Sequence, residues 1–538
     1  MATTDFDFAA WPPQLTPEQL QILVGKATSR ALATGLLYLP PGYPLDSPPP
    51  QAAIHAPLSL LPAPFPRESF ELAQEIQSVY NTLYAQIAMD TPFLDEVMGA
   101  EKGVGKVDEF IGELWRGWKK LRDSGRISQP LHLGLFRSDY LYHMPENGLQ
   151  TLKQVEFNTI SVSFGCLSQR IAELHRHLLL STSYFGSSPH LKPENLPQND
   201  TIAGLASGLG AAHAAYVSTG GSSTSKILFV VQPGERNVFD QKWLEYELLE
   251  KHNIHAVRQT FEELITSSSV DPQTSLLTVS PKNSPEQDTE VSVVYYRSGY
   301  MPNEYPSPEY YETRFRLESS KAIKCPTIPL QLAGGKKVQE VLGRKGLVER
   351  FLPDLPQSQI DDLRKTFMDM WGLDEDSQTA VGEVGSSPPA SAAPNGDAAS
   401  EPLGTLKARK EYASLVLKPQ REGGGNNVYK GDIPAFLDGL PPQEREAWIA
   451  MRLIEVPKGV KGWLVRAGSL DFATTSPSER AVQAEIVSEL GIFGWALFGD
   501  GQVVAEEEVG WLVRTKGKDS NEGGVATGFS VLDSVLLV

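Results

Sequence analysis

The feature that most constrains the fold is the alternation of short apolar runs with helical patterns in the middle of the chain. Lys226–Gln232 (KILFVVQ) has the composition of a buried strand, and a helical pattern follows over Gln241–Lys251. Ile254–Arg258 and Val291–Tyr296 have the pattern of two further strands. Strands that alternate with helices are typical of a parallel sheet with helical cover. The pattern therefore predicts an α/β fold in this region.

The last third of the chain has a different pattern. Short β-type runs are closely spaced there, which favours an α+β arrangement with antiparallel sheet. The runs are Leu415–Lys418, Gly462–Arg466, Gln483–Glu485, Trp495–Phe498, Val503–Glu506 and Trp511–Thr515.

Two stretches have the composition of insertions or linkers. Residues 181–225 are rich in Ser, Gly, Pro and Asn, and we expect them to be partly loop, although the Ala/Gly segment around Ala203–Tyr216 could be helical. Residues 375–402 contain almost no large apolar side chain, and no Lys or Arg occurs between Thr366 and Leu406. A segment with low hydrophobicity and one sign of charge cannot offset the entropy of ordering. We therefore expect 375–402 to be a disordered acidic insertion.

Composition excludes several classes of function. The 538 residues include 48 Lys and Arg against 66 Asp and Glu, a formal net charge of −18. So acidic a chain is a poor candidate for binding nucleic acid or an anionic membrane. Its two cysteines, Cys166 and Cys325, cannot form a disulfide framework, which suits a reducing compartment. The start lacks the pattern of a signal peptide and no window is apolar enough to span a membrane, so we expect a cytoplasmic protein.

The most specific motif is Leu415–Tyr429, LVLKPQREGGGNNVY. It predicts a strand that ends at Lys418 and a loop with three consecutive glycines, whose N–H groups can approach an anion. Lys418 adds a point charge for phosphate, and Glu422 could hold Mg²⁺. The alternative is a flexible surface loop. The flanking Lys, Arg, Glu and paired Asn favour the ligand loop, although it is not a Walker A motif.

A second glycine loop lies in Leu512–Gly528, LVRTKGKDSNEGGVATG. On a strand, Arg514 and Lys516 share one face, and the residues between them occupy the other. The two cations would then point the same way just before Gly523–Gly524. A charged edge strand that resists aggregation is the alternative.

A third element is Gln154–Gly165, QVEFNTISVSFG. Glu156 and Asn158 share one face of the predicted strand and are a plausible pair of ligands for a hard cation. Upstream, Arg137 follows an apolar run, where its guanidinium could clamp a carboxylate. Taken alone, each fragment is better explained as the polar edge of a sheet.

The middle block offers three more segments with functional side chains. Glu235–Gln241 (ERNVFDQ) and Arg297–Tyr300 (RSGY) each follow a predicted strand, and strand-end loops are where α/β sheets bind ligands. Lys336 and Lys337 lie at a predicted helix start. Without these neighbours, a solvated lysine would be the default interpretation of Lys336.

Together these segments resemble eukaryotic glutathione synthetase, an ATP-grasp ligase family. The motifs are LFRSDY, EFNTIS, ERNVFDQ, QLAGGKK, LKPQREGGGNN, SELGIFG and LVRTK…EGGVA, and the match runs from about Phe110 to the C-terminus in the family's order. The resemblance implies an ATP-grasp core formed by 1–225 and 334–538 with glycine-rich lid loops. It also implies an inserted α/β substrate-binding domain over 226–333, and a homodimer.

The resemblance also implies the reaction. ATP would drive the joining of γ-glutamylcysteine to glycine through an acyl phosphate, with release of ADP and phosphate. Phosphoryl transfer depends on positioning and charge neutralisation more than on a protein nucleophile. The lack of histidine after His255 is therefore no obstacle.

Site residues follow from the resemblance position by position. Mg²⁺, as two ions with ATP, would be held by Glu156, Asn158 and Glu422. ATP would contact Glu156, Lys336, Lys418, Glu422, Gly423, Gly424, Gly425, Asn426, Asn427, Tyr429, Met451, Arg452, Leu453, Ile454, Glu489, Lys516 and Glu522. The dipeptide or product would contact Arg137, Ile160, Ser161, Val162, Ser163, Glu235, Arg236, Asn237, Gln241, Arg297, Ser298, Gly299, Tyr300, Arg514, Val525 and Ala526. Arg514, Arg137 and Lys418 would stabilise the transition state.

Three positions depart from the family pattern. An acid usually follows the methionine of the adenine-binding segment, where this chain has Arg452, and Asp is usual where it has Ser298. The usual Ala-Ala of the last loop is Ala526–Thr527, while relatives that use β-alanine typically have Leu-Pro there. Glycine is thus the favoured acceptor. A ligase with a shifted acceptor and a nucleotide-binding scaffold without catalysis are the alternatives.

Overall fold

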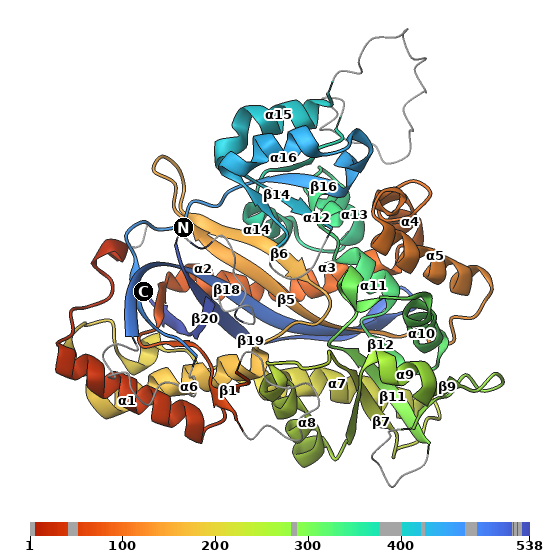
Figure 1. Ribbon diagram of the computed structural model, residues 1–538, viewed down its shortest axis with the longest axis horizontal. Coiled ribbons are helices and arrows are strands. Elements are labelled where there is room, and N and C mark those ends of the chain that lie inside the picture. The colour runs from red at the N-terminus through yellow and green to blue at the C-terminus, as the bar shows by residue number, and fades with distance from the viewer. Residues whose placement is uncertain are drawn as a thin grey trace.

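The computed structural model describes residues 6–40, 52–280, 288–375, 401–420, 425–467, 481–518, 520, 525 and 530–538. Within these residues the chain forms a 13-stranded mixed sheet, a separate four-stranded sheet and two small two-stranded sheets. Figure 1 shows the large sheet crossing the middle of the molecule with helices on both faces, and the four-stranded sheet lying apart at the top. The mixed α/β architecture confirms the expected fold class.

The α/β unit predicted for the middle of the chain is confirmed. β7 (Lys226–Val230) pairs in parallel with β8 (Ala256–Gln259) and with β11 (Thr289–Tyr296), which in turn pairs in parallel with β12 (Ile323–Cys325). α8 (Val238–His252) connects β7 to β8, as expected for a crossover. Both faces of such strands are covered, which explains their continuous apolar runs. The short strands β9 (Ser268–Val270) and β10 (Leu277–Val279) extend the edge in antiparallel fashion.

The C-terminal part is antiparallel, as predicted, but its strands are longer than the sequence pattern indicated. Gln483–Glu485 and Trp495–Phe498 lie within one strand, β18 (Ala481–Gly499), and Val503–Glu506 and Trp511–Thr515 lie within β19 (Gln502–Gly517). Glycines and acids interrupt the apolar pattern without interrupting the pairing, because bulges after Phe493 and Leu497 absorb the irregularity. The expectation of separate short strands was therefore wrong.

Around this hairpin the large sheet is completed by strands from distant parts of the chain. β18 pairs with β5 (His132–His143), and β5 pairs with β6 (Thr151–Asn158). β19 pairs with β20 (Ser530–Asp533), while β17 (Lys461–Val465) and β3 (Leu58–Ser59) close that edge. The small two-stranded sheets are β1 (Leu37–Tyr38) with β2 (Ile54–His55), and β4 (Ala63–Phe65) with β21 (Val535–Leu537).

Helices cover both faces of the central strands. α3 (Gln77–Met89) packs on one face, where Tyr84 stacks on Phe157 of β6 at 3.9 Å between ring centroids. α6 (Gly165–Thr182) and α7 (Thr201–Ser218) pack on the other. α7 lies inside the segment 181–225 that we expected to be partly loop. The remaining helices are α1 (Pro17–Ala33), α2 (Arg67–Glu75), α4 (Thr91–Val97), α5 (Glu109–Asp123), α9 (Phe261–Ser267), α10 (Pro308–Ser319), α11 (Ile328–Ala333), α12 (Lys336–Leu342), α13 (Leu347–Phe351) and α14 (Gln357–Thr366).

The four-stranded sheet has a hydrophobic core of its own. Its order is β13 (Met370–Gly372), β16 (Trp448–Arg452), β14 (Leu415–Pro419) and β15 (Val428–Tyr429), with antiparallel pairing throughout. α15 (Leu403–Glu411) and α16 (Ile433–Gly439) cover one face. A separate core makes this sheet a second structural unit, which we call the small sheet.

The domain limits 1–225, 226–333 and 334–538 stay predictions. Of the predicted acidic insertion 375–402, residues 376–400 lie outside the described part of the chain.

Candidate active site

The alternation of side chains along extended strands gathers polar groups on the face of the large sheet opposite α3. Phe136 and Phe157 point into the core beneath α3, so their strand neighbours point the other way. Cross-strand pairing with β18 and β19 then brings six polar side chains together on that face. They are Arg137 and Asp139 of β5, Glu156 and Asn158 of β6, Glu489 of β18 and Arg514 of β19.

Asp139 lies at the centre of this cluster and is fully buried. Its Oδ1 accepts from Nε of Arg137 at 2.6 Å, and its Oδ2 accepts from Nη2 of the same guanidinium at 2.8 Å. Nη2 of Arg514 donates to Oδ2 at 3.0 Å and also to Glu489. Nδ2 of Asn158 donates to Oδ2 at 3.0 Å. One carboxylate therefore holds two arginines and an amide.

Glu156 sits between the two sheets. Nζ of Lys336, the first residue of α12, lies 3.1 Å from its carboxylate, and Nζ of Lys418 on β14 donates to the carbonyl of Val155 at 2.8 Å. Burial raises the pKa of Glu156, but the charges of Lys336, Lys418 and Arg514 outweigh it and hold the pKa well below the usual value. Glu156 is therefore a carboxylate at any physiological pH. The predicted helix start at Lys336 and strand end near Lys418 are confirmed.

The small sheet carries the residues expected to bind the nucleobase. Met451 is buried on β16, and the backbone N–H of Leu453 donates to the carbonyl of Ser414 at 2.9 Å. Asn427 donates to the hydroxyl of Tyr429 at 3.2 Å. Ile454 follows Leu453, two residues after the end of β16.

Arg452, which departs from the family pattern, is accommodated by acids of the same unit. Its Nε lies 3.1 Å from Asp369 and its Nη2 lies 2.7 Å from Glu411. These two carboxylates compensate the cation, and the backbone of β16 keeps its pairing with β13 and β14. The side chain thus serves ion pairing on the small sheet.

Several predicted nucleotide and substrate contacts lie outside the described residues. They are Glu422, Gly423, Gly424, Glu522 and Ala526. Next to them, Gly425 has a left-handed backbone with φ of 96°, which favours glycine, and Asn426 follows it. Val525 is buried in the hydrophobic core. Lys516 lies two residues beyond Arg514 on β19 and faces the same way, as predicted.

The loop over Ile160–Ser163 is held between two arginines. Arg297 donates to the carbonyl of Val162 and, at 2.7 Å, to the hydroxyl of Ser163. Arg137 reaches the carbonyl of Ser163 at 3.4 Å. The hydroxyl of Ser161 donates to the carbonyl of Tyr296 at 3.1 Å. This loop therefore joins the central cluster to the α/β unit.

The segment after β7 forms the other wall. Glu235 accepts from the backbone N–H of Asn237 at 2.9 Å and from the Gln241 amide at 3.2 Å. Among the described residues, the buried Oδ1 of Asn237 has no hydrogen-bond partner, so it is available to a ligand. Arg236 turns elsewhere: its Nε donates to the carbonyl of Leu39 at 3.0 Å, and its guanidinium lies over the Tyr38 ring.

Sequence reasoning missed two carboxylates in quoted motifs. Asp139 stands two residues after Arg137, and an acid at that spacing shares its strand face, which is the signal that could have found it. Asp240 accepts from the backbone N–H groups of Phe164, Cys166 and Leu167, at 2.7 to 3.1 Å, and so caps α6. Burial raises the pKa of Asp240, while Arg297 and these N–H groups oppose the rise.

Glu304 is a third missed residue, and it organises the loop Arg297–Tyr300. It accepts from the backbone N–H groups of Tyr300 and Met301 at 2.9 and 2.8 Å. The hydroxyl of Ser298 donates to it at 2.7 Å, and the amide of Gln232 at 2.8 Å. An acid from outside the motif thus supplies a negative charge beside Ser298, where the family usually has Asp. Glu304 ends the short helix η5 (Pro302–Glu304), three residues after Met301, and an acid at that position of a helix start is the local signal that could have found it.

The donor groups at the centre fit a hard divalent cation. Asn158 uses its Nδ2 on Asp139 and on the carbonyl of Arg137, which leaves its Oδ1 as the group that can face a metal. Glu156 supplies an ionised carboxylate, and Mg²⁺ prefers such oxygens. The described residues contain no group of three or more His, Cys, Asp or Glu placed to hold a metal, and the third expected ligand, Glu422, is not among them.

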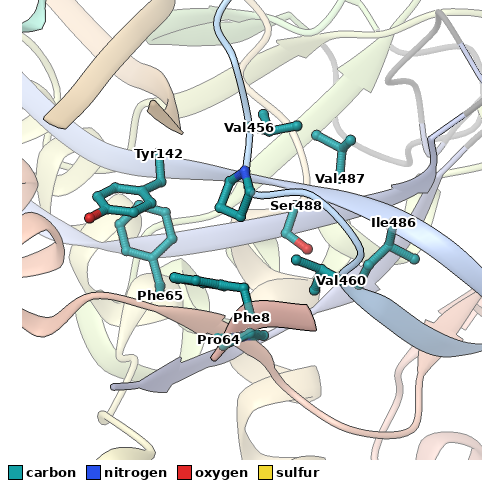
Figure 2. A pocket seen from close by; sticks show the side chains of 10 residues that line it. Phe8, Pro64, Phe65, Tyr142, Val456, Val460, Ile486, Val487 and Ser488 are labelled. Carbon is teal, nitrogen blue, oxygen red and sulfur yellow. The ribbon is translucent and has the colours of Figure 1, made fainter. Parts of the chain in front are cut away.

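A hollow beside this region is too small to be the substrate site. Figure 2 shows it lined mainly by apolar side chains, among them Phe8 near the N-terminus, Phe65 of β4, Tyr142 of β5, Val460 of the linker after β16 and Ile486 of β18. Its volume of about 30 Å³ admits one or two water molecules. A nucleotide or a dipeptide is too large for this volume.

The sequence is similar to that of a known protein family over almost its whole length. The family described as eukaryotic glutathione synthase, ATP binding domain, matches residues 17–537. The chain is 36% identical to glutathione synthetase of Mus musculus over 529 residues, covering 98% of each, and 37% identical to that of Homo sapiens over 520 residues, covering 96% of this chain and 97% of the relative. The glutathione synthetase large chain of Schizosaccharomyces pombe is 35% identical over 548 residues, covering 97% and 98%.

A solved structure shares the fold. A glutathione synthetase-like effector from Globodera pallida, in its apo form, superimposes with a TM-score of 0.69 over 98% of both chains at 22% identity.

Proposed function

The chain belongs to the family of eukaryotic glutathione synthases, and we propose that the polar cluster between its two sheets is the active site for joining γ-glutamylcysteine to glycine. The observation that carries this assignment is a cluster of cations where the two sheets meet. Arg137 and Arg514 of the large sheet bind Asp139. Lys336 pairs with the neighbouring Glu156, and Lys418 of the small sheet donates to the carbonyl of Val155. An ATP-dependent carbon–nitrogen ligase needs such a surplus of fixed cations, because two polyanionic substrates must be brought together.

The first half of the reaction makes an acyl phosphate. A carboxylate oxygen of the cysteinyl residue attacks the γ-phosphorus of ATP, the bond to the bridging oxygen breaks, and ADP leaves. Lys336 and Lys418 would hold the phosphates at the junction of the sheets. Arg514 would neutralise charge that develops on the transferred group. Its own charge is secure: burial lowers the pKa of Arg514, but Glu489 and Asp139 outweigh this and raise it.

The second half makes the peptide bond. The glycine amine attacks the acyl carbon, the carbon–oxygen bond to phosphate breaks, and the amine loses a proton. The loop Ile160–Ser163, with Arg297 and Glu235, would hold the dipeptide during this step. Water must be excluded, since it would hydrolyse the acyl phosphate.

We also propose Glu156, Asn158 and Glu422 as the ligands of Mg²⁺. Bound there with ATP, the ion would neutralise phosphate charge. The support is the ionised state of Glu156 and the orientation of the Asn158 amide described above.

A coupled assay of ADP release tests the function. ATP with γ-glutamylcysteine should give ADP when glycine is added and little without it. Faster turnover with β-alanine or serine would instead indicate a shifted acceptor. Nucleotide binding without dipeptide-dependent ADP release would overturn the assignment in favour of a scaffold.

Arg514→Ala tests the site within that assay. We expect turnover to fall by about 10²- to 10³-fold, as when one transition-state donor is removed. Lys518→Ala is the matched control. Lys518 is a cation that directly follows the end of β19, but its side chain lies at the surface in an ion pair with Glu485. Near-normal turnover in Arg514→Ala would contradict the proposed site.

A cytoplasmic homodimer is a further proposal. None of the helices in the described ranges is long and apolar enough to cross a membrane. Exposed apolar side chains occur on α1 (Ile22, Leu32) and on α8 (Tyr246, Leu249), and Trp243 of α8 donates to the carbonyl of Gly35 just after α1. This apolar exposure supports an interface there. Sedimentation of the intact chain should give twice the monomer mass, and a monomer at micromolar concentration would contradict the proposal.

A further inference from the structure

We propose that Asp139 is a positioning residue that sets the two active-site arginines and fixes which end of the Asn158 amide faces the metal. The inference rests on the proposed function, because it assigns a role within the same site. Asp139 is fully buried beneath the side chains of Arg137, Arg514 and Asn158, so it would act through them.

The Asp139 carboxylate is held in a fixed position by its hydrogen bonds. Asp139 accepts four hydrogen bonds from three side chains, at 2.6 to 3.0 Å, and is fully buried. The fork of Arg137 binds both of its oxygens, which fixes the plane of that guanidinium. The same Oδ2 then receives Arg514 from a strand on the other side of β18. The relative placement of the two arginines therefore depends on one atom.

The neighbouring strand is shaped to admit this pair. Gly491 of β18 lies directly opposite Asp139. A Cβ at that position would stand 2.9 Å from Oδ1 of Asp139 and 2.9 Å from Cδ of Arg137. Any residue larger than glycine at position 491 would displace the Arg137–Asp139 ion pair. Gly491 leaves room for it because it has no side chain.

Charge makes the carboxylate hard to replace. Two guanidiniums that share a buried site repel each other, and a buried cation needs a charged partner. Glu489 pairs with Arg514, whereas Asp139 is the carboxylate in contact with Arg137. Neutralising Asp139 would leave Arg137 buried with the carbonyl of Ser163 as its one uncharged acceptor among the residues that the structure describes.

The Asn158 amide supplies the link to the metal. A carboxylate can only accept, so the group that Asn158 turns towards Asp139 must be its NH₂. The carbonyl of Arg137 accepts from the same nitrogen at 3.3 Å. The amide oxygen is thereby directed away from Asp139, as a metal ligand requires. An amide at position 139 could donate as well as accept and would remove this constraint.

Asp139→Asn is the test, with Ser138→Ala as control because Ser138 lies on the opposite face of β5. Two quantities are measured on each purified full-length protein: kcat for ADP release, and Mg²⁺-dependent binding of a non-hydrolysable ATP analogue by calorimetry. We expect kcat to fall about 100-fold and the Mg²⁺ concentration for half-maximal binding to rise about 10-fold. Binding of the analogue without Mg²⁺ should change little, which a general loss of structure would not produce.

Wild-type kcat and Mg²⁺ dependence in a folded Asp139→Asn protein would overturn the inference. If that variant fails to fold, Asp139→Glu retains the charge and moves the carboxylate outward by one methylene. We expect it to lower kcat and weaken Mg²⁺-dependent binding, and unchanged values would again overturn the inference. If the wild type itself releases no ADP with dipeptide and glycine, the proposed function fails, while the binding measurement still decides the role of Asp139.

Discussion

Glu304 illustrates how one side chain can set the shape of a binding loop. It lies outside the motif Arg297–Tyr300, yet it accepts from Ser298, from the backbone of Tyr300 and from Gln232. Hydrogen bonds to a carboxylate are roughly twice as strong as those to a neutral acceptor. The conformation of the loop therefore depends on the charge of Glu304.

Glu304→Gln should loosen this loop and weaken binding of the dipeptide more than binding of ATP. We expect the KM for γ-glutamylcysteine to rise about 10-fold, as the loss of one charged hydrogen bond of about 1.5 kcal/mol implies, with the KM for ATP within twofold of wild type. Steady-state kinetics with each substrate varied in turn measures both. Glu312→Gln on α10 is an exposed control. Equal changes in the two KM values would argue against a role confined to the dipeptide side.

At the scale of elements, the long hairpin β18–β19 depends on glycine where α3 crosses it. A Cβ on Gly494 would stand 2.6 Å from the amide group of Asn81, which itself donates to Glu506 at 3.1 Å. The neighbouring Trp495 faces α7 instead, since a Cβ on Gly208 of α7 would meet its ring. The two faces of one strand thus make close contacts with two different helices.

Gly494→Ala should therefore destabilise the protein. Overpacking a close contact costs about 1–3 kcal/mol. Gly517→Ala is the matched control, because a Cβ there meets no atom within 4 Å and the residue ends the same hairpin. Denaturant unfolding of the two variants should show a lower midpoint for Gly494→Ala only. Similar midpoints would mean that α3 yields without strain.

At the scale of the whole molecule, β20 near the C-terminus pairs with β3 from the N-terminal part of the chain, and β20 carries the buried acid Asp533. Asp533 of β20 is fully buried and accepts from Thr515 of β19 and from the backbone of Ser534, each at 2.7 Å. Burial raises the pKa of Asp533 to about 7, while hydrogen bonds from Ser59 and Thr515 act the other way. The folded protein thus favours the protonated acid.

This acid should make stability fall as pH rises. The unfolded carboxyl ionises near pH 4, so the contribution of the protonated form is complete below that pH and is lost as pH approaches 7. Between pH 5 and 7 the wild type should lose up to about 1.4 kcal/mol per pH unit relative to Asp533→Asn, which keeps an acceptor without a charge. Unfolding by denaturant from pH 5 to pH 8 measures the difference. Parallel profiles would contradict the assignment.

Net charge is also a property of the whole molecule, and here it hides the local arrangement. The chain carries a formal charge of −18, yet arginines and lysines gather at the junction of its two sheets. The sum therefore says little about which ligands a closed pocket binds, because local placement of charge decides that.

The sequence by itself determined the features that depend on local spacing. A period of two residues placed Glu156 with Asn158, and Arg514 with Lys516, on one face each, and apolar runs predicted the parallel unit over Lys226–Tyr296. The glycine-rich motif with Lys418 and Glu422 predicted a loop for a phosphate ligand, and the resemblance of the motifs taken together implied an ATP-dependent ligase. These inferences hold because the pattern of a strand or a loop is contained in a few consecutive residues.

Only the tertiary structure decided which of these elements meet. Asp139 and Arg514 are 375 residues apart, and Val155 and Lys418 are 263 apart. The joining of short β-type runs into β18 and β19 also depended on pairing with each other and with β5. Such contacts follow from the order of strands in the sheet and from burial against α3, α6 and α7. No local pattern encodes that order, because it arises from the packing of the whole chain.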